Sequence, residues 1–443
     1  MALPAREPES KPPKPRRRRP TRTRIGREGR RTCQPGEPSV RVPLAEIPRH
    51  LGPGLISGLS ALDPTTVATL AIVGSTLGYQ LLWLILLLLP MLVTVQVISA
   101  RVGLVAEHEL ATVIRDKFGR LWAAIAALLV VSVNLLTIAA DLGGGAAALG
   151  ILTGLDWRWF VPPLALALGT LLLLGGYYGV QRVLRYVMVV FAAYVVAAFL
   201  VQPDWGQVLR HAFVPTLSTS PDYVAGALAI LGTTLTSYVY FWETIEMQEE
   251  RRPLAFLWVV ELDAAIGMVA AAVVSAFVVI TTGATLGMRG EAVGSAEDAA
   301  KALVPLAGPL AGYLFALGLL ASAVLAIPVL SSTTAYVLAD TVQWGPSGTP
   351  RESGRPFHLV LLGSLAIGTL VALLGIEPFR LLFFAGIAGG IGTPLLLGLL
   401  VLVARDPEIM CDRRIGAGLA TMAWLTTAVV GFASLLYLAQ QLM

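Results

Sequence analysis

The chain of 443 residues is 56% hydrophobic and only 14% charged, with a mean hydropathy of +0.74. Soluble globular proteins carry roughly 25% charged residues, so this composition excludes a water-soluble fold. It also excludes disorder over most of the chain, because disordered segments are poor in apolar residues, and it indicates a polytopic membrane protein.

Basic residues are concentrated at the N-terminus. Residues 1–49 hold 14 of the 32 Lys and Arg but only 5 of the 28 Asp and Glu, so their net charge is +9 and that of the other 394 residues is −5. The run at 15–20 (PRRRRP) matches a nucleic-acid or localisation pattern. A polybasic segment beside a membrane domain is also typical of contact with anionic lipid, and we favour this interpretation and expect no nucleic-acid partner. The sequence predicts a disordered basic tail over 1–49 and a transmembrane domain over 50–443.

Charge-free apolar runs predict about eleven membrane-spanning helices, since a membrane helix needs about 20 apolar residues. We place them near 54–76, 80–101, 122–150, 161–181, 183–202, 224–247, 257–282, 306–339, 357–375, 379–404 and 415–440.

The distribution of Lys and Arg among the loops predicts the orientation of these helices. With the tail in the cytoplasm, the cytoplasmic loops hold 13 basic residues and the opposite face holds five. We therefore expect an integral protein of the plasma membrane, with a cytoplasmic N-terminus and an outer C-terminus.

Asp63 is an ionisable residue inside the first predicted span, and Pro64, Thr65 and Thr66 follow it. Pro64 removes a backbone donor and disfavours helix at the residue before it. A carboxylate at a helix break with hydroxyls beside it is typical of an ion-binding site, because freed carbonyls and side-chain oxygens converge there. The alternative is a proline kink whose aspartate only caps the second half-helix. We favour the ion-binding interpretation.

The sixth predicted span contains a matching polar stretch at 232–238 (GTTLTSY). Hydroxyls can donate hydrogen bonds to carbonyls of their own helix. One interpretation is therefore a continuous helix, weakened by Ser and Thr, at a packing interface. The first and sixth spans, however, are equivalent members of a five-plus-five inverted repeat, in which paired interrupted helices mark a substrate site. We expect an all-α, LeuT-like membrane fold with helices 1 and 6 broken.

Other acidic residues lie within or close to the apolar spans, where a charge is costly and often functional. Asp141 precedes a run of glycines that permit close helix approach, and either a structural hydrogen bond or a proton relay fits it. Two interpretations of Glu243 stay open: it belongs either to an acid pair at the cytoplasmic end of the sixth span or to the loop that follows this span. Glu246 is predicted to lie in that loop. Glu261 and Asp263 are predicted to be interfacial.

Motifs of enzymes are missing from the sequence. It has no nucleophile elbow in a strand–turn–helix setting, no His-Glu-x-x-His and no phosphate-binding loop. We expect neither an enzyme nor a cofactor, and an ion gradient or the membrane potential as the energy source.

The segments 52–64 and 77–83 resemble the Nramp (natural-resistance-associated macrophage protein) family of divalent-metal transporters. Residues 134–148 resemble the third helix of that family, 233–242 the sixth and 314–322 the eighth. The similarity extends over roughly 50–440 and is greatest to the branch associated with magnesium transport. It implies a transporter domain that moves a divalent cation across the bilayer into the cytoplasm by alternating access.

The resemblance also implies a set of site residues. The aspartate of the family's Asp-Pro-Gly-Asn motif matches Asp63, and its asparagine ligand is replaced by Thr66. In the sixth-helix Met-Pro-His motif, Thr236 stands in place of the thioether ligand and Tyr238 in place of the histidine. The carbonyls that bind metal map to Ser60 and Thr233.

The family's proton-pathway aspartate matches Asp141, but the glutamate one turn later is Gly144. The resemblance places Asp141 and Tyr238 in or near that pathway, and Glu243 is a further candidate. Because the histidine and the glutamate are both replaced, we favour voltage-driven transport without protons over proton symport.

The replaced ligands change the expected substrate. A thioether favours soft transition metals, whereas Thr236 leaves an all-oxygen site with one carboxylate, which suits hydrated Mg²⁺ or both Mg²⁺ and Mn²⁺. Two alternatives stay open: a transporter of an amino acid or organic cation with the same fold, and a non-transporting membrane receptor or scaffold.

Overall fold

A computed structural model of the chain describes residue 58 and residues 61–174, 195–250, 253–304, 308–342 and 355–442. Within these ranges the regular structure is helical, without a β-strand. The longer helices are α3 (Pro64–Leu77), α4 (Leu82–Ala106), α6 (Arg120–Thr153), α7 (Val161–Leu174), α10 (Pro221–Thr234), α11 (Ser237–Glu250), α12 (Leu257–Thr285), α15 (Ala311–Val342), α16 (Arg355–Ala372), α17 (Pro378–Arg405) and α19 (Ala417–Leu442). The shorter ones are α5 (Leu110–Phe118), α9 (Trp205–Phe213), α13 (Ala296–Lys301) and α18 (Pro407–Met410).

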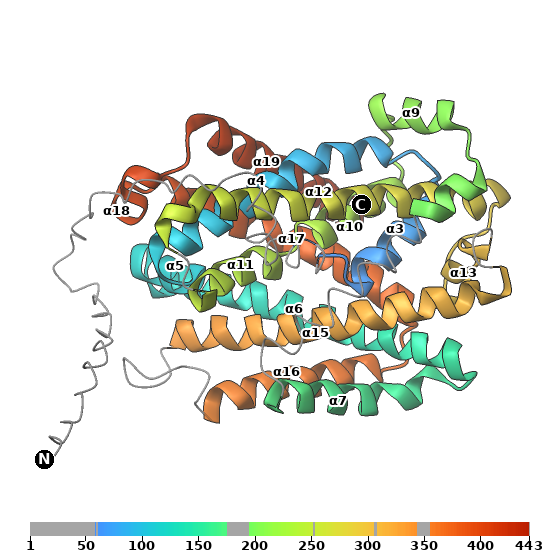
Figure 1. Cartoon of the computed structure of the whole chain (residues 1–443), viewed down its shortest axis with the longest axis horizontal. Helices are drawn as coiled ribbons and strands as arrows, with labels where there is room; N and C mark the ends of the chain where they lie inside the picture. Colours follow the sequence, from blue (N-terminus) through green and yellow to red (C-terminus); the bar gives the residue numbers. More distant parts are fainter. Residues whose placement is uncertain are drawn as a thin grey trace, which may run out of the picture.

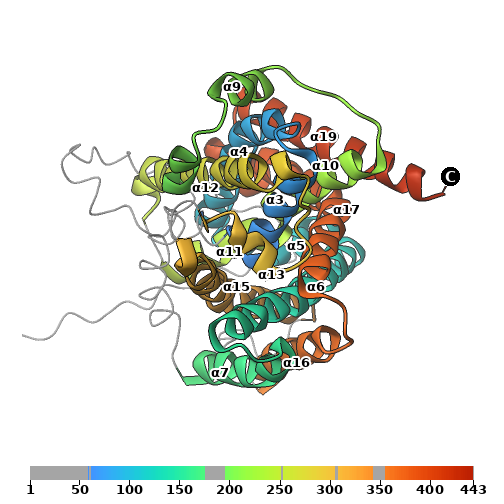
Figure 2. The same cartoon turned by 90° about the vertical axis from the view of Figure 1, so that its right-hand side faces the viewer.

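The long helices run side by side in one bundle, as the two perpendicular views show (Figure 1, Figure 2). Eight helical stretches in the described ranges are long and apolar enough to cross a membrane, and each matches a predicted span. Two shorter apolar helices, Pro64–Leu77 and Trp157–Leu173, match the first and fourth predicted spans. The fifth predicted span, 183–202, lies mostly outside the described residues. The expected all-α membrane fold is confirmed.

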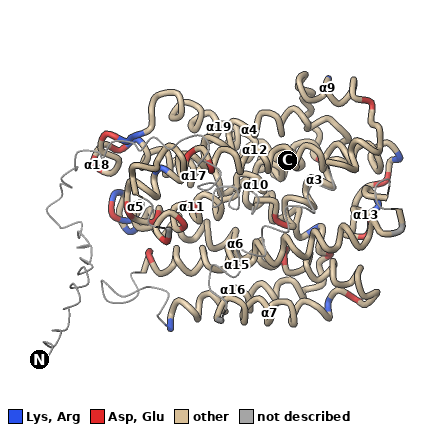
Figure 3. Tube along the Cα trace, viewed as in Figure 1, with Lys and Arg blue, Asp and Glu red and all other residues tan. Residues whose placement is uncertain are grey.

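Charged residues gather at the two ends of the bundle and are sparse between them (Figure 3). At one end, called here the α5 end, Lys117 forms ion pairs of 2.7 Å with both Asp406 and Glu408. At the other end, called the α13 end, Lys301 forms an ion pair of 2.7 Å with Asp298. An apolar middle between two charged ends is the pattern that a bilayer requires.

The first broken helix is set by its sequence. Gly58 is helical, Ala61 and Leu62 form a turn and a bend, and α3 begins at Pro64, with the extended Asp63 as its N-cap. Proline is favoured in the first turn of a helix, where its missing N–H is not needed, and aspartate is a preferred N-cap. The sixth predicted span is broken as well, because α10 ends at Thr234 and α11 begins at Ser237.

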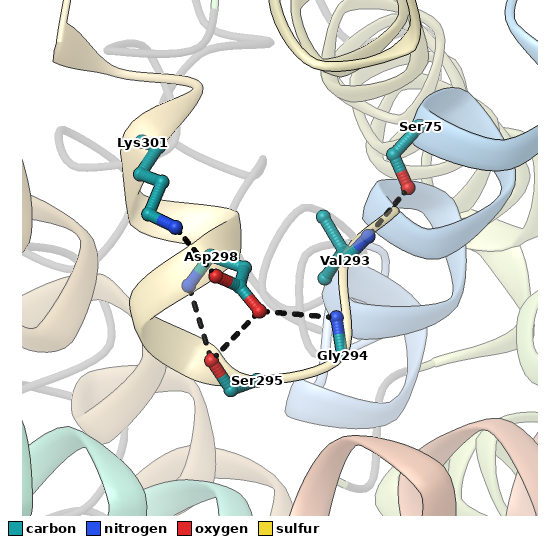
Figure 4. A network of polar contacts seen from close by, with 6 residues as sticks. All are labelled: Ser75, Val293, Gly294, Ser295, Asp298 and Lys301. Atoms are coloured by element: carbon teal, nitrogen blue, oxygen red, sulfur yellow. Dashed lines mark hydrogen bonds and ion pairs between the residues drawn. The ribbon is translucent and has the colours of Figure 1, made fainter. Parts of the chain in front are cut away.

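The far end of α3 is tied to the α13 end of the bundle (Figure 4). The N–H of Val293, in the loop before α13, donates to Oγ of Ser75 at 3.0 Å. The same loop is closed by Asp298, whose Oδ2 accepts from Gly294 N at 3.3 Å and from Ser295 Oγ at 3.1 Å. The helix α3 therefore runs from the break at Asp63 towards the α13 end.

Glycines bring the helices around the breaks into close contact. A Cβ atom on Gly232 of α10 would lie 2.0 Å from the Gly386 carbonyl oxygen and 2.1 Å from Gly390 N, both in α17. A Cβ on Gly144 of α6 would lie 3.2 Å from Cβ of Pro64. The close helix approach expected after Asp141 is confirmed, and it places α3, α6, α10 and α17 around one point.

Candidate ion-binding site

Asp63 lies at the point where the two broken helices meet. Its side chain is buried. Oδ1 accepts the backbone N–H of Thr66 at 2.7 Å, and Oδ2 accepts the hydroxyl of Tyr238, from the first turn of α11, at 3.1 Å. A carboxylate oxygen has two lone pairs, so both oxygens keep capacity for a further partner. Asp63 therefore caps α3 and also faces α11. Its role as an N-cap is compatible with a position in an ion-binding site.

Thr66 and Thr233 connect α3 directly to α10. Their hydroxyl oxygens are 2.8 Å apart, and the Thr66 hydroxyl also reaches the Ala61 carbonyl oxygen at 2.8 Å. The Thr233 carbonyl oxygen is 3.4 Å from the Thr66 hydroxyl. Both predicted site residues are buried and belong to one cluster of oxygen atoms with Asp63.

Asp141 joins α6 to the start of α3. Its Oδ1 accepts two hydrogen bonds from Thr65, one from the hydroxyl at 2.8 Å and one from the backbone N–H at 3.2 Å. Its Oδ2 is buried and has no hydrogen-bond partner among the described residues. Asp141 therefore lies beside the candidate site, connected to it through the residue next to Thr66.

Thr236 stands in the break between α10 and α11 and is buried. Its carbonyl oxygen accepts the N–H of Val239 at 3.3 Å. Ser60, the remaining predicted ligand, lies outside the described residues. In the described part of the chain no three His, Cys, Asp or Glu side chains form a group able to hold a metal ion. Asp63 is the carboxylate at the helix breaks, among hydroxyl and carbonyl oxygens, and Asp141 is joined to this region through Thr65.

Thr393 of α17 is a residue of this region that the sequence analysis did not identify. Its hydroxyl reaches the Leu235 carbonyl oxygen at the break at 3.3 Å, besides bonding back to Gly389 O at 2.7 Å. The only sequence signal was a lone threonine after a run of glycines, which does not reveal a contact with a helix 158 residues away.

Two acidic residues of α11, Glu243 and Glu246, are buried in the protein. Glu243 is buried, and its Oε2 accepts from Gln96 Nε2 of α4 at 2.5 Å. Glu246 is buried within α11, so its assignment to a loop was wrong: the helix continues to Glu250. Asp263 is also buried, whereas Glu261 forms an ion pair of 2.5 Å with Arg101.

The donor set of the site defines its chemistry. One carboxylate, two threonine hydroxyls and the backbone carbonyls freed by two helix breaks are all hard oxygen ligands. Oxygen ligands suit Mg²⁺, Ca²⁺ and Mn²⁺, and soft metals prefer thiolate or thioether. This site fits a hard cation that keeps part of its water shell.

The architecture defines the class of fold as the LeuT-like fold, which solved transporter structures share. The nucleobase-cation-symport-1 family transporter Mhp1, in a closed conformation, shares it with a TM-score of 0.59 at 15% identity, over 87% of this chain and 91% of that one. The manganese transporter of Eremococcus coleocola is more similar, with a TM-score of 0.74 at 19% identity, over 91% of this chain and 89% of that one.

The family follows from the sequence. The family profile described as "Natural resistance-associated macrophage protein-like" (Nramp) matches residues 54–440. The "Divalent metal cation transporter MntH" of Deinococcus radiodurans is 27% identical over 416 residues, which are 86% of this chain and 87% of the relative. The chain belongs to the Nramp family, and the resemblance seen in its motifs is confirmed.

Proposed function

We propose that this protein is a secondary transporter that carries divalent cations of the Mg²⁺ and Mn²⁺ class into the cytoplasm by alternating access. The observation that carries the proposal is the position of Asp63, a buried carboxylate between the start of α3 and Tyr238 of α11. Two similar proteins, a divalent metal cation transporter and a manganese transporter, support a cation over an organic substrate.

The hard character of the ligands supports Mg²⁺ or an unselective Mg²⁺/Mn²⁺ site. Magnesium usually keeps several waters and is often held by only one or two carboxylates, as Asp63 would hold it here. Thr236, in the break of the sixth span, supplies oxygen where the family motif supplies sulfur. Thr66 and Thr233 are the hydroxyl ligands of this proposed site, and Ser60 and Thr233 would add carbonyl oxygens.

Transport is proposed to be driven by voltage without protons. One charge crossing 100 mV corresponds to about 2.3 kcal/mol, which is a sufficient driving force for a divalent ion. The position of the missing glutamate, Gly144, is filled by neighbours, because a Cβ there would lie 3.2 Å from both Pro64 and Leu382 side-chain atoms. The remaining candidate proton carriers are Asp63, Asp141 and Glu243, and proton symport is the alternative.

The orientation is proposed from charge. The α5 end carries Lys117, Arg115 and Arg120 and would face the cytoplasm, in agreement with the positive-inside rule. The α13 end would then face outwards, and the basic tail over 1–49 would lie near anionic lipid of the inner leaflet.

The experiment is uptake into proteoliposomes that contain a Mg²⁺- or Mn²⁺-sensitive dye, compared among wild type, Asp63→Ala and Asp63→Asn. Asp156→Asn serves as the matched control, since Asp156 lies outside the bundle and is exposed. We expect both Asp63 variants to lose uptake and Asp156→Asn to keep it. Equal uptake by wild type and Asp63→Ala would remove the proposed site.

The same preparation separates the transporter from its alternatives. Titration calorimetry with Mg²⁺ and Mn²⁺ against a set of amino acids and organic cations should give heats of binding for the metals alone. Binding of an amino acid, with none of either metal, would favour an organic substrate. A scaffold would neither transport nor bind any of these ligands.

A further inference from the structure

The hydroxyl of Thr69 differs from most other buried threonine hydroxyls of the bundle. A buried threonine in a helix usually donates to the carbonyl four residues earlier. The chain does this repeatedly, for example at Thr137, Thr234, Thr282, Thr333 and Thr334. The Oγ1 of Thr69 in α3 is fully buried and has no hydrogen-bond partner among the described residues. An unpaired buried hydroxyl is unfavourable, so it requires an explanation.

The position of Thr69 relates it to the proposed cation site. It lies three residues after Thr66, and residues at this spacing share one face of a helix about 4.5 Å apart along its axis. Because α3 runs towards the α13 end, Thr69 lies on that side of the Thr66–Thr233 hydroxyl pair.

Two other helices meet α3 at the Thr69 hydroxyl. A Cβ atom built on Gly386 of α17 would lie 3.3 Å from Thr69 Oγ1 and 3.2 Å from the Ala229 carbonyl oxygen of α10. Ala229 is one turn before Thr233 in α10, again towards the α13 end, because Gly226 lies beside Leu77 at the far end of α3. The hydroxyl and the carbonyl thus both lie against Gly386, where α3, α10 and α17 converge, on the α13 side of Asp63 and Thr66.

We propose that Thr69 contacts the transported cation, by accepting a hydrogen bond from its water shell as the ion passes between the α13 end and Asp63. The proposal rests on the proposed function, since it assumes a divalent cation that keeps bound water. The waters of a divalent cation are strong donors that need acceptors, and a site with one carboxylate leaves most of them to neutral oxygens. When α3, α10 and α17 separate around the ion, Thr69 gains the partner that it lacks in the conformation described here.

The test uses Thr69→Val, which keeps the shape of the side chain and removes the hydroxyl, and Thr69→Ser, which restores it. Thr112→Val is the matched control, because the Thr112 hydroxyl in α5 is also buried and without a partner among the described residues but lies at the opposite end of the bundle. The readouts are the initial rate and KM of Mg²⁺ and Mn²⁺ uptake into proteoliposomes and the melting temperature in detergent.

We expect Thr69→Val to raise the KM for Mg²⁺ about fivefold, the change that loss of one hydrogen bond produces. The KM for Mn²⁺ should rise less, since Mg²⁺ gives up its water more reluctantly. The melting temperature should stay the same or rise, because an unpaired hydroxyl has been removed. Thr69→Ser should restore the wild-type KM, and Thr112→Val should leave uptake unchanged.

Wild-type kinetics in Thr69→Val would overturn the role of Thr69. If that variant does not fold, Thr69→Ser and Thr69→Ala are compared instead, because the first keeps the hydroxyl and the second removes it. Equal kinetics in these two variants would also overturn the role of Thr69. The Asp63→Asn variant separates this failure from failure of the proposed function. Loss of uptake in Asp63→Asn together with wild-type kinetics in Thr69→Val contradicts only the contact with Thr69, whereas full uptake in Asp63→Asn contradicts the cation site itself.

Discussion

The hydroxyl oxygens of Thr66 and Thr233 lie 2.8 Å apart, and they join the two broken helices at the level of Asp63. One belongs to α3 and the other to the last turn of α10. In the conformation described here the two hydroxyls bond to each other, so a cation that binds to both must replace this hydrogen bond. A cation bound at the proposed site would therefore compete with the contact that links α3 to α10.

A double-mutant cycle of Thr66→Val and Thr233→Val tests this link. Each single change should raise the KM for Mg²⁺ by about three- to tenfold, as expected for a lost hydrogen bond or ligand. The double variant should be little worse than either single one, because each single change already breaks the hydroxyl pair. Effects on KM that multiply in the double variant would show that the two hydroxyls act independently.

Thr236→Met should shift the substrate preference towards soft metals. A thioether in the break between α10 and α11 favours Cd²⁺ over Mg²⁺. We expect the ratio of Cd²⁺ to Mg²⁺ uptake to rise about tenfold, which corresponds to about 1.4 kcal/mol. Thr236→Val is the control, since it removes the hydroxyl without adding sulfur. An unchanged ratio in Thr236→Met would mean that this side chain does not face the ion.

Competition between metal ions for uptake by the wild type is a second test of the proposed all-oxygen site. A millimolar excess of Mg²⁺ should strongly reduce Mn²⁺ uptake, because the oxygen ligands offer little basis for choosing between the two ions. Mn²⁺ or Cd²⁺ uptake that is untouched by a large Mg²⁺ excess would contradict the hard-site account.

Gly232→Ala should destabilise the bundle. The added methyl group would meet the backbone of Gly386 and Gly390 at 2.0 and 2.1 Å, and these backbone atoms cannot turn away as a side chain can. Overpacking typically costs about 1–3 kcal/mol, so the melting temperature should fall clearly. The matched control is Gly363→Ala in α16, where nothing lies within 4 Å of the added Cβ and no loss of stability is expected. Equal melting temperatures in the two variants would contradict the close packing of α10 and α17.

Much of the fold could be predicted because its determinants are local. Pro64 sets the start of α3 by itself, and a long apolar run identifies a membrane helix without any knowledge of its neighbours. Errors arose where a distant partner decides the structure. The second span is predicted to end near residue 101, whereas α4 continues to Ala106, and the charge of Arg101 is paired with Glu261 of α12.

The same distinction applies to the site. Asp63 was identified from its own neighbours in the sequence, and the break at Thr236 was found from the polar stretch around it. The bond between Thr65 and Asp141, the pair of Gln96 and Glu243 and the contact of Thr393 with Leu235 depend on the register of one helix against another. No pattern within one segment determines that register.

The coupling prediction concerns Asp141. In liposomes whose voltage is clamped with potassium and valinomycin, we expect metal influx to leave the internal pH unchanged, because Gly144 stands where a glutamate would complete a relay. Asp141→Asn should keep the fold, since an amide oxygen still accepts both bonds from Thr65. Acidification that follows metal addition to the wild type and disappears in Asp141→Asn would instead establish proton symport and assign the relay to this residue.

The measurement that tests the account most directly is anomalous diffraction from crystals soaked in Mn²⁺. The account predicts one strong peak within coordinating distance of an Asp63 carboxylate oxygen, between the start of α3 and the break that precedes Tyr238. Crystals of Asp63→Asn, soaked in the same way, should lack this peak. A strong Mn²⁺ peak elsewhere in the bundle, unchanged in Asp63→Asn, would contradict the central claim that Asp63 binds the transported ion.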